Sequence, residues 1–323
     1  MTTQETPERT STFAELFDRI TSNMSAVIRG KQHVIDLSVL CLVAQGHLLV
    51  EDVPGVGKTS LAKALARSLD CSFGRVQFTP DLLPSDVVGV TVWNRTDSQF
   101  EFRPGPVFAS VVLADEINRA SPKTQSALLE AMAEDQVTVD ATTYRLGPTF
   151  MVIATQNPIE HEGTYPLPES QLDRFLMRVS IGYPDREAEM DVLDAHGEVS
   201  TLQDLQPVAT AAEIQGMTAA ARTVHVAPEL KAYLVDLADA TRRHPRLLLG
   251  MSPRATLALQ RVARARAAAE GRGFVTPDDI KALAEPVLAH RLLATPEAQL
   301  AGITPSEAVR DVLGTVAVPS VRG

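Results

Sequence analysis

A glycine-rich stretch at residues 51–59 (EDVPGVGKT) has the residue types of a phosphate-binding loop. Its glycines let backbone N–H groups turn toward an anion, and a helix expected directly after them points its positive end at the same phosphates. The lysine would reach the β- and γ-phosphates, and the hydroxyl of Thr59 would be offered to Mg²⁺. The residues expected to bind the nucleotide here are Pro54, Gly55, Val56, Gly57, Lys58, Thr59 and Ser60.

The pattern G-x-x-x-x-G-K-[ST] is met except at its first position, where Asp52 replaces glycine. An ordinary glycine-rich turn that carries a lysine is the alternative interpretation. An apolar run at 47–50 before the loop and a helix-like run at 59–69 after it favour a phosphate-binding loop. Because the first glycine is the least demanding position for phosphate contact, we expect Asp52 to leave activity intact.

Two adjacent carboxylates, Asp115 and Glu116, end an apolar run at 110–114. The first would hold Mg²⁺ through water, and the second would orient and polarise an attacking water as a general base. Solvated acids at the end of a strand are the alternative, and the nearby phosphate loop disfavours it. Thr59 and Asp115 are therefore the expected metal-binding pair.

Asn157 follows another apolar run, 149–154, and its amide could bond both the γ-phosphate and the attacking water. An asparagine before a proline is also a common turn former. Lys58, Asp115 and Asn157 all lie just past strand ends, and a parallel sheet binds its ligand at the carboxyl ends of its strands. This coincidence favours the functional interpretation.

Three arginines are candidates for stabilising charge on a transferred phosphoryl group. Arg174 and Arg178 are four residues apart, which predicts one helical face, and one of them could complete a neighbouring subunit's site. Salt bridges with Asp173 or Glu169 are the alternative. Arg254 is expected in the first turn of a helix, where the helix dipole disfavours a cation, so an anionic partner is expected: a nucleotide phosphate or a local carboxylate.

The segment around Ile28 and Gly30 breaks two expected helices. In a nucleotide-binding fold its backbone could line an adenine pocket, and a plain turn between helices is an equally good interpretation.

Apolar runs that alternate with helical runs predict a mainly parallel sheet and an α/β fold. The expected strands are 47–50, 75–78, 110–114, 149–154 and 177–181. Two β-hairpins are expected beside them, at 89–103 and 136–146. Aromatic residues on the first hairpin, Trp93 and Phe100 among them, could grip a substrate, although pairing across the hairpin is favoured.

Beyond Pro184 the chain becomes helical and alanine-rich, with helices expected near 185–197, 210–222, 228–243, 253–270, 276–292 and 305–316. We therefore divide it into a disordered tail (1–11), a nucleotide-binding core (12–184) and a helical domain (185–323). Thr12 and Glu15 predict the first helix start.

Composition limits the classes of function. The 323 residues carry a net charge of −10, which argues against general binding to nucleic acid or anionic membranes. Cys41 and Cys71 fit no metal spacing and favour buried thiols in a reducing compartment. No stretch reaches the length of a membrane span, and the first residues do not resemble a signal peptide, so we expect a cytoplasmic protein.

Five stretches together resemble AAA+ ATPases of the MoxR family: EDVPGVGKTSLAKALA (51–66), FTPDLLPSDVVGV (78–90), LADEINRA (113–120), ATQNPIEHEGTYPLPESQLDRFLMR (154–178) and GMSPRA (250–255). The resemblance covers roughly residues 12–295. It implies an AAA+ parallel sheet with flanking helices and inserted hairpins, followed by an all-α lid domain.

The resemblance also implies roles for individual residues. Asp115 and Glu116 would be the Walker B pair, Asn157 sensor 1 and Arg254 sensor 2. Arg174 would be the arginine finger, with Arg178 as second choice. ATP and Mg²⁺ are the implied ligands, bound between subunits of a ring that is usually a hexamer.

The implied work is chaperone-like remodelling or maturation of a partner complex, often with a von Willebrand factor A domain protein. A motor subunit of a metal chelatase is the alternative. A nucleic-acid motor is disfavoured because the hairpin tips, residues 94–98 and 140–143, are neutral and negative. A nucleotide-gated scaffold is disfavoured by Glu116.

Overall fold

The computed structural model describes residues 5–157, 164–184, 186, 189–190 and 202–319. Its centre is a parallel sheet with strand order β2-β5-β8-β1-β9, which confirms the expected α/β fold. Each strand overlaps one of the expected strands. They are β1 (Leu48–Glu51), β2 (Phe73–Gln77), β5 (Val111–Asp115), β8 (Met151–Gln156) and β9 (Met177–Val179).

Both faces of the sheet are covered, which explains why its three central strands, β5, β8 and β1, are mostly apolar and buried, whereas the edge strand β2 alternates. Leu48 and Val50 belong to one buried cluster and Leu49 to the other, as the two-residue period of a strand requires. The first cluster includes α1 (Glu5–Ser25), α2 (Gln32–Val43) and α3 (Lys58–Ser68), and the second includes α4 (Pro84–Val88) and α5 (Pro122–Glu134).

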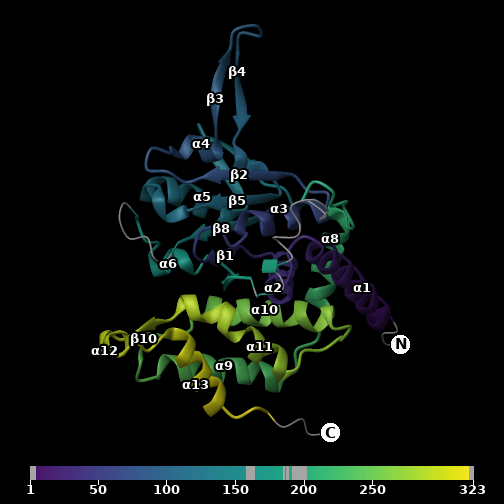
Figure 1. Cartoon of the computed structure of the whole chain (residues 1–323), viewed down its shortest axis with the longest axis vertical. Coiled ribbons are helices and arrows are strands. Elements are labelled where there is room, and N and C mark those ends of the chain that lie inside the picture. Colours follow the sequence, from purple (N-terminus) through teal and green to yellow (C-terminus); the bar gives the residue numbers. More distant parts are fainter. Residues whose placement is uncertain (1–4, 158–163, 185, 187–188, 191–201, 320–323) are drawn as a thin grey trace.

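Two antiparallel hairpins form separate two-stranded sheets, as the alternating segments predict. They are β3 (Gly89–Asn94) with β4 (Gln99–Pro104), and β6 (Gln136–Val139) with β7 (Thr142–Arg145). The first projects far from the body of the molecule (Figure 1). Trp93 and Phe100 pair edge to face across it with ring centroids 5.0 Å apart, the arrangement favoured from the sequence.

The C-terminal part is helical and lies against α1 and α2 through its longest helix, α10 (Pro253–Ala269) (Figure 1). The side chain of Ser252 caps α10 by accepting a hydrogen bond from the backbone of Ala255. The other helices are α8 (Ala211–Thr223), α9 (Pro228–Arg242), α11 (Pro277–Leu288), α12 (Pro296–Leu300) and α13 (Pro305–Thr315). A short strand pair, β10 (Leu247–Leu249) with β11 (Leu293–Ala294), was not expected. The helix expected over 185–197 lies largely outside the described residues.

The beginning of the chain differs from expectation. Helix α1 begins at Glu5, so residues 5–11, which we assigned to a disordered tail, are helical, and Thr12 lies inside the helix rather than at its start. Pro7 is compatible with this because a first-turn residue needs no backbone N–H. The domain boundary near Pro184 stays a prediction. Among the described helices, none combines the length and the apolar character needed to cross a membrane.

Candidate active site

The phosphate loop connects the end of β1 to the start of α3. Gly55 and Gly57 have φ angles of +86° and +94°, in the left-handed region that glycine adopts without strain. A Cβ atom added to either glycine would meet nothing within 4 Å, so the loop is open on that side. The loop therefore has the backbone shape and the free space that a phosphate group requires.

Lys58 is held by its own loop. Its Nζ atom donates a hydrogen bond of 2.6 Å to the backbone carbonyl of Asp52. Burial lowers the pKa of Lys58, while the charges of Asp52, Asp115 and Glu116 act in the opposite direction. The structure thus brings Lys58, the predicted general base Glu116 and the predicted metal ligand Asp115 into one electrostatic environment.

Asp115 is the last residue of β5, and both of its oxygens have partners. Oδ1 accepts from the hydroxyl of Thr155 at 2.7 Å, and Oδ2 forms an ion pair with Arg75 at 2.8 Å. The same threonine oxygen accepts the backbone N–H of Glu116 at 2.9 Å. Thr155, on the neighbouring strand β8, therefore fixes both carboxylate residues relative to each other.

Glu116 has the left-handed backbone conformation, with φ of 56°, which is uncommon for a residue with a side chain. Its Oε2 accepts from the amide of Gln77 at 2.9 Å and from Arg119 at 3.1 Å. Sequence reasoning missed Gln77, Arg119, Arg75 and Thr155. The alternation of β2 was the available signal for Arg75 and Gln77, because β2 pairs directly with β5.

The remaining nucleotide-binding candidates are Asn157 and the turn around Ile28 and Gly30. Asn157 directly follows β8, the neighbour of both β5 and β1. Ile28 and Val56 pack against the same buried cluster, and Gly30 has a φ of +69°. Lys31 donates to the carbonyl of Tyr183 at 2.7 Å, which ties this turn to the segment after β9.

The set of oxygen ligands around Asp115 suits Mg²⁺. A carboxylate at Asp115 and a hydroxyl at Thr59, in the first turn of α3, are hard ligands of the kind this ion prefers. The described residues contain no group of three or more His, Cys, Asp or Glu side chains that could hold a metal ion. Mg²⁺ commonly binds through one or two protein ligands with substrate phosphates and water, so these residues fit the ion.

The expectation that Arg174 and Arg178 share a helical face is wrong. Helix α6 (Glu169–Leu172) ends before Arg174, and Arg178 lies in β9. The pairing of β9 with β1 overrides the helical spacing, and Arg178 forms an ion pair with Glu51 at 2.9 Å. Arg174 donates to the carbonyl of Leu129 at 2.8 Å.

Arg254 lies in the first turn of α10 and has a local carboxylate, Asp173, at 4.0 Å. Asp173 also pairs with Arg291 at 3.2 Å. Of the two partners considered from the sequence, the structure supplies the carboxylate. Arg254 is 56% exposed, which leaves much of its guanidinium accessible.

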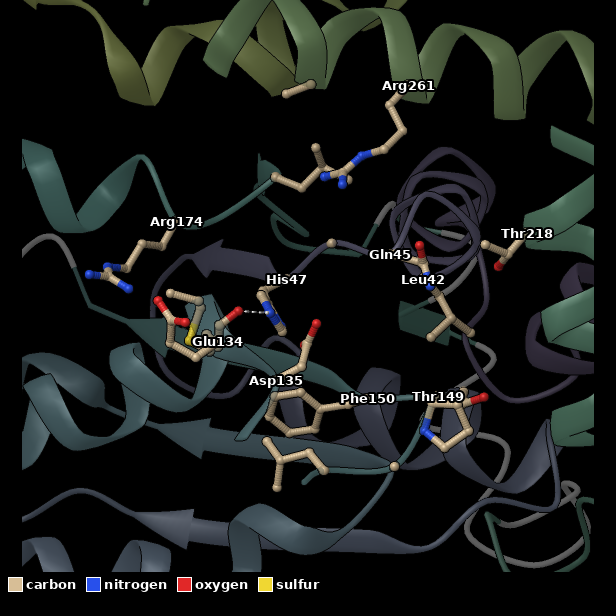
Figure 2. A pocket seen from close by; sticks show the side chains of 18 of the residues that line it. Leu42, Gln45, His47, Glu134, Asp135, Thr149, Phe150, Arg174, Thr218 and Arg261 are labelled. Atoms are coloured by element: carbon tan, nitrogen blue, oxygen red, sulfur yellow. Dashed lines mark hydrogen bonds between the residues drawn. The ribbon is translucent and has the colours of Figure 1, made fainter. Parts of the chain in front are cut away.

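Arg174 and Arg254 line a cavity of about 970 Å³ at the amino ends of the strands (Figure 2). His47, directly before β1, and Phe150, directly before β8, also line it. The phosphate loop and Asp115 lie at the carboxyl ends of the same sheet. The structure therefore places the predicted site residues at two opposite edges, and sequence reasoning did not anticipate the cavity.

Arg261 projects from α10 into this cavity (Figure 2). Burial lowers its pKa, and the neighbouring charges of Arg222 and Arg254 lower it further. Six arginines line the cavity against three acidic residues, Glu134, Asp135 and Asp173. The cavity thus has an excess of positive charge.

Two family models match the chain. Residues 47–177 match the ATPase family associated with various cellular activities (AAA), and residues 239–312 match the AAA lid domain. A crystal structure of a candidate ATPase from Cytophaga hutchinsonii superimposes with a TM-score of 0.90 at 37% identity, covering 97% of this chain and 98% of that one.

Curated relatives match over most of their length. Uncharacterized protein YeaC of Bacillus subtilis is 47% identical, over 95% of this chain and 96% of its own. Chaperone MoxR1 of Mycobacterium tuberculosis is 40% identical, over 94% and 82%. Protein MoxR of Paracoccus denitrificans is 34% identical, over 84% and 87%. With these matches, the parallel sheet and the lid, the chain belongs to the MoxR family of AAA+ ATPases.

Proposed function

We propose that this protein hydrolyses ATP to ADP and phosphate in a Mg²⁺-dependent reaction, and that it uses this reaction to remodel or mature a partner protein complex. The observation that carries the proposal is the cluster at the carboxyl edge of the sheet. There an open glycine loop, Lys58 and two bonded carboxylates lie together.

The residues divide the work of hydrolysis. The backbone N–H groups of Gly55 and Gly57 and the charge of Lys58 bind and orient the phosphates. Thr59 and Asp115 would hold Mg²⁺, which would supply neutralisation of charge on the phosphate oxygens. Glu116 orients the attacking water and accepts its proton as the new oxygen–phosphorus bond forms, while the bond from the γ-phosphorus to the bridging oxygen breaks and that oxygen leaves with ADP. The bonds from Gln77 and Arg119 hold Glu116 in place before substrate arrives.

Arg174 and Arg254 serve the site of a neighbouring subunit. They lie at the amino edge of the sheet, one strand length from their own phosphate loop, and a strand extends about 3.3 Å per residue. In a closed ring of identical subunits, a head-to-tail interface joins two different surfaces of the chain. The two surfaces in this proposal are the amino edge of one copy and the carboxyl edge of the next. A homo-oligomeric ring, most simply a hexamer, therefore completes the active site, with Arg174 as the arginine finger and Arg254 as sensor 2.

The chaperone-like role is supported by the relative from M. tuberculosis, which is named Chaperone MoxR1. A partner with a von Willebrand factor A domain is suggested by the family resemblance. A cytoplasmic setting is suggested by the composition and by the character of the first residues. The net charge of −10 supports a protein client rather than nucleic acid.

The direct test is ATP turnover and nucleotide binding by Glu116→Gln. The variant should bind ATP with wild-type affinity while kcat falls roughly a hundredfold or more, because a general base contributes about that much. Glu130→Gln, a change at an exposed position of α5, is the matched control and should leave both unchanged. Normal turnover by Glu116→Gln, or no turnover by the wild-type protein at any concentration, would overturn the proposal.

A further inference from the structure

Asp52, which replaces the first glycine of the phosphate-loop pattern, is a buried carboxylate with several hydrogen-bond donors. It is 8% exposed. Its Oδ2 accepts from the backbone N–H of Gly182 at 2.6 Å and from the hydroxyl of Ser180 at 3.0 Å. Its Oδ1 accepts from the backbone N–H of Val53 at 2.9 Å. Burial would raise the pKa of Asp52, but these hydrogen bonds outweigh burial and lower it.

The donors on the far side belong to the segment that leaves the core. Ser180 and Gly182 directly follow β9, and Gly182 has a φ of +66°. Ile181, between them, is buried in the main cluster. The next residue, Tyr183, accepts the hydrogen bond of Lys31. Two contacts thus hold the connection from the sheet toward the helical part. Asp52 of the phosphate loop bonds Ser180 and Gly182, and Lys31 bonds the next residue, Tyr183.

The main chain of Asp52 has a second task, because its carbonyl oxygen accepts the hydrogen bond of Lys58. One residue therefore bonds the segment after β9 through its carboxylate and the phosphate-binding lysine through its backbone. Glycine at this position could supply the carbonyl but not the carboxylate. It would leave the exposed hydroxyl of Ser180 and the half-buried backbone N–H of Gly182 without this acceptor, so the contact between the loop and this segment would be lost.

We propose that Asp52 is a positioning residue that couples the phosphate loop to the segment 180–183. The carboxylate anchors the peptide whose carbonyl orients Lys58, so nucleotide binding at the loop and ordering of the segment stabilise each other. The inference rests on the proposed nucleotide site, and it adds a link from that site to the start of the helical part.

The test uses the full chain and a fluorescent ADP analogue, mant-ADP, as the probe. Asp52→Asn keeps the size of the side chain but replaces one of the two acceptor oxygens with an NH₂ group. In either orientation of the amide the NH₂ group then faces a donor, either Val53 or the pair Ser180 and Gly182. We expect the Kd for mant-ADP to rise about tenfold, the scale of about 1.4 kcal/mol. Ser180→Ala removes one donor and should raise it less. Asp86→Asn, which changes a carboxylate that caps α4 far from the loop, should leave it unchanged.

A second measurement separates coupling from a purely structural role. Mant-ADP should slow hydrogen exchange of the peptide covering 180–183 in the wild type, and this protection should disappear in Asp52→Asn. In the double variant with Lys58→Ala, the effect of Asp52→Asn on affinity should shrink, because its action passes through the lysine. Circular dichroism and thermal unfolding establish whether each variant is folded. If Asp52→Asn does not fold, the same measurements are made on Ser180→Ala.

The two proposals fail in different ways. Wild-type protein that does not bind mant-ADP would refute the nucleotide site itself. Wild-type protein that binds, together with an Asp52→Asn variant of equal affinity or with unchanged protection at 180–183, would overturn only the role of Asp52.

Discussion

The two edges of the central sheet have opposite electrostatic designs. At the carboxyl edge each charge has a specific partner: Thr155 and Arg75 bond Asp115, Gln77 and Arg119 bond Glu116, and the carbonyl of Asp52 holds Lys58. At the amino edge cations gather in a cavity with fewer acids, and Arg261 has two other arginines as charged neighbours.

The difference indicates which edge is complete within one chain. A preorganised set of bonded groups is what a catalytic centre needs, because the groups need not rearrange during the reaction. An excess of like charge in a cavity is unfavourable for a single chain and becomes favourable when an anion arrives. The amino edge therefore has the properties of a surface that receives negative charge, such as a nucleotide held by another copy.

The strongest test of this comparison is Arg174→Ala. We expect the variant to fold and to bind nucleotide at its own carboxyl edge, while turnover falls on the order of a thousandfold, because arginine fingers contribute about that much. Mixing it with Lys58→Ala should restore turnover. In a mixed ring, some interfaces then combine an intact Lys58 from one copy with an intact Arg174 from the next.

Arg178→Ala is the matched control for that mixing experiment. Its ion pair with Glu51 lies within the chain, so a defect in this variant should not be restored by Lys58→Ala protein. Restoration of Arg178→Ala would make Arg178 the residue that acts on the neighbouring subunit. A failure to restore Arg174→Ala would remove the support for Arg174 in that role.

The positions of Lys58, Asp115 and Glu116 at the carboxyl edge were predictable from the sequence because each signal is local. The partners of the two carboxylates were missed, since most of them lie on other strands: Arg75, Gln77, Arg119 and Thr155. An apolar run followed by acids or by a glycine loop indicates both the strand and the group at its end, as at Asp115 and Lys58. The hairpins were predictable for the same reason, since alternation and a polar turn lie within one short segment.

The amino edge was not predictable, because it depends on which distant segments meet. Arg261, on α10, faces residues before β1 and β8, and no local pattern records that meeting. The prediction that Arg178 lies on a helix was wrong for a related reason, because pairing of β9 with β1 outweighed a helical spacing. The carboxylate of Asp52 could be located in the loop, but its partners Ser180 and Gly182 lie far along the chain.

His47, at the amino edge, makes the stability of the folded chain depend on pH. It accepts from the backbone N–H of Val152 at 3.0 Å, and its other ring nitrogen lies 3.1 Å from the carbonyl of Met132. Burial lowers its pKa from 6.5 to about 4; the Met132 carbonyl opposes this, and the charges of Arg261 and Arg254 add to it. The unfolded chain therefore binds a proton between these values and the folded chain does not, so stability is lost as pH falls from 6.5 toward 4.

We expect the free energy of unfolding to fall by up to roughly 1.4 kcal/mol per pH unit from this group. His47→Gln should be less stable at pH 7, because it loses a buried hydrogen-bonded ring, but should depend less steeply on pH between 7 and 5. His33→Gln, at an exposed position of α2, is the control and should keep the wild-type slope. An unchanged slope for His47→Gln in urea titrations would show that its ring is not held neutral.

The smallest expected effect is a gain in stability from Arg261→Gln. Burial and the charges of Arg222 and Arg254 disfavour the charged form of Arg261, so its removal should raise the Tm of unassembled protein by a few degrees at most. The matched change at the carboxyl edge, Arg75→Gln, removes a favourable ion pair with Asp115 and should lower the Tm slightly. Nucleotide-dependent assembly should reduce or reverse this gain in Tm, because an anion bound in the cavity attracts the charged Arg261. If Arg261→Gln instead lowers the Tm of the isolated chain, the amino edge is already satisfied by its own acids and needs no neighbour.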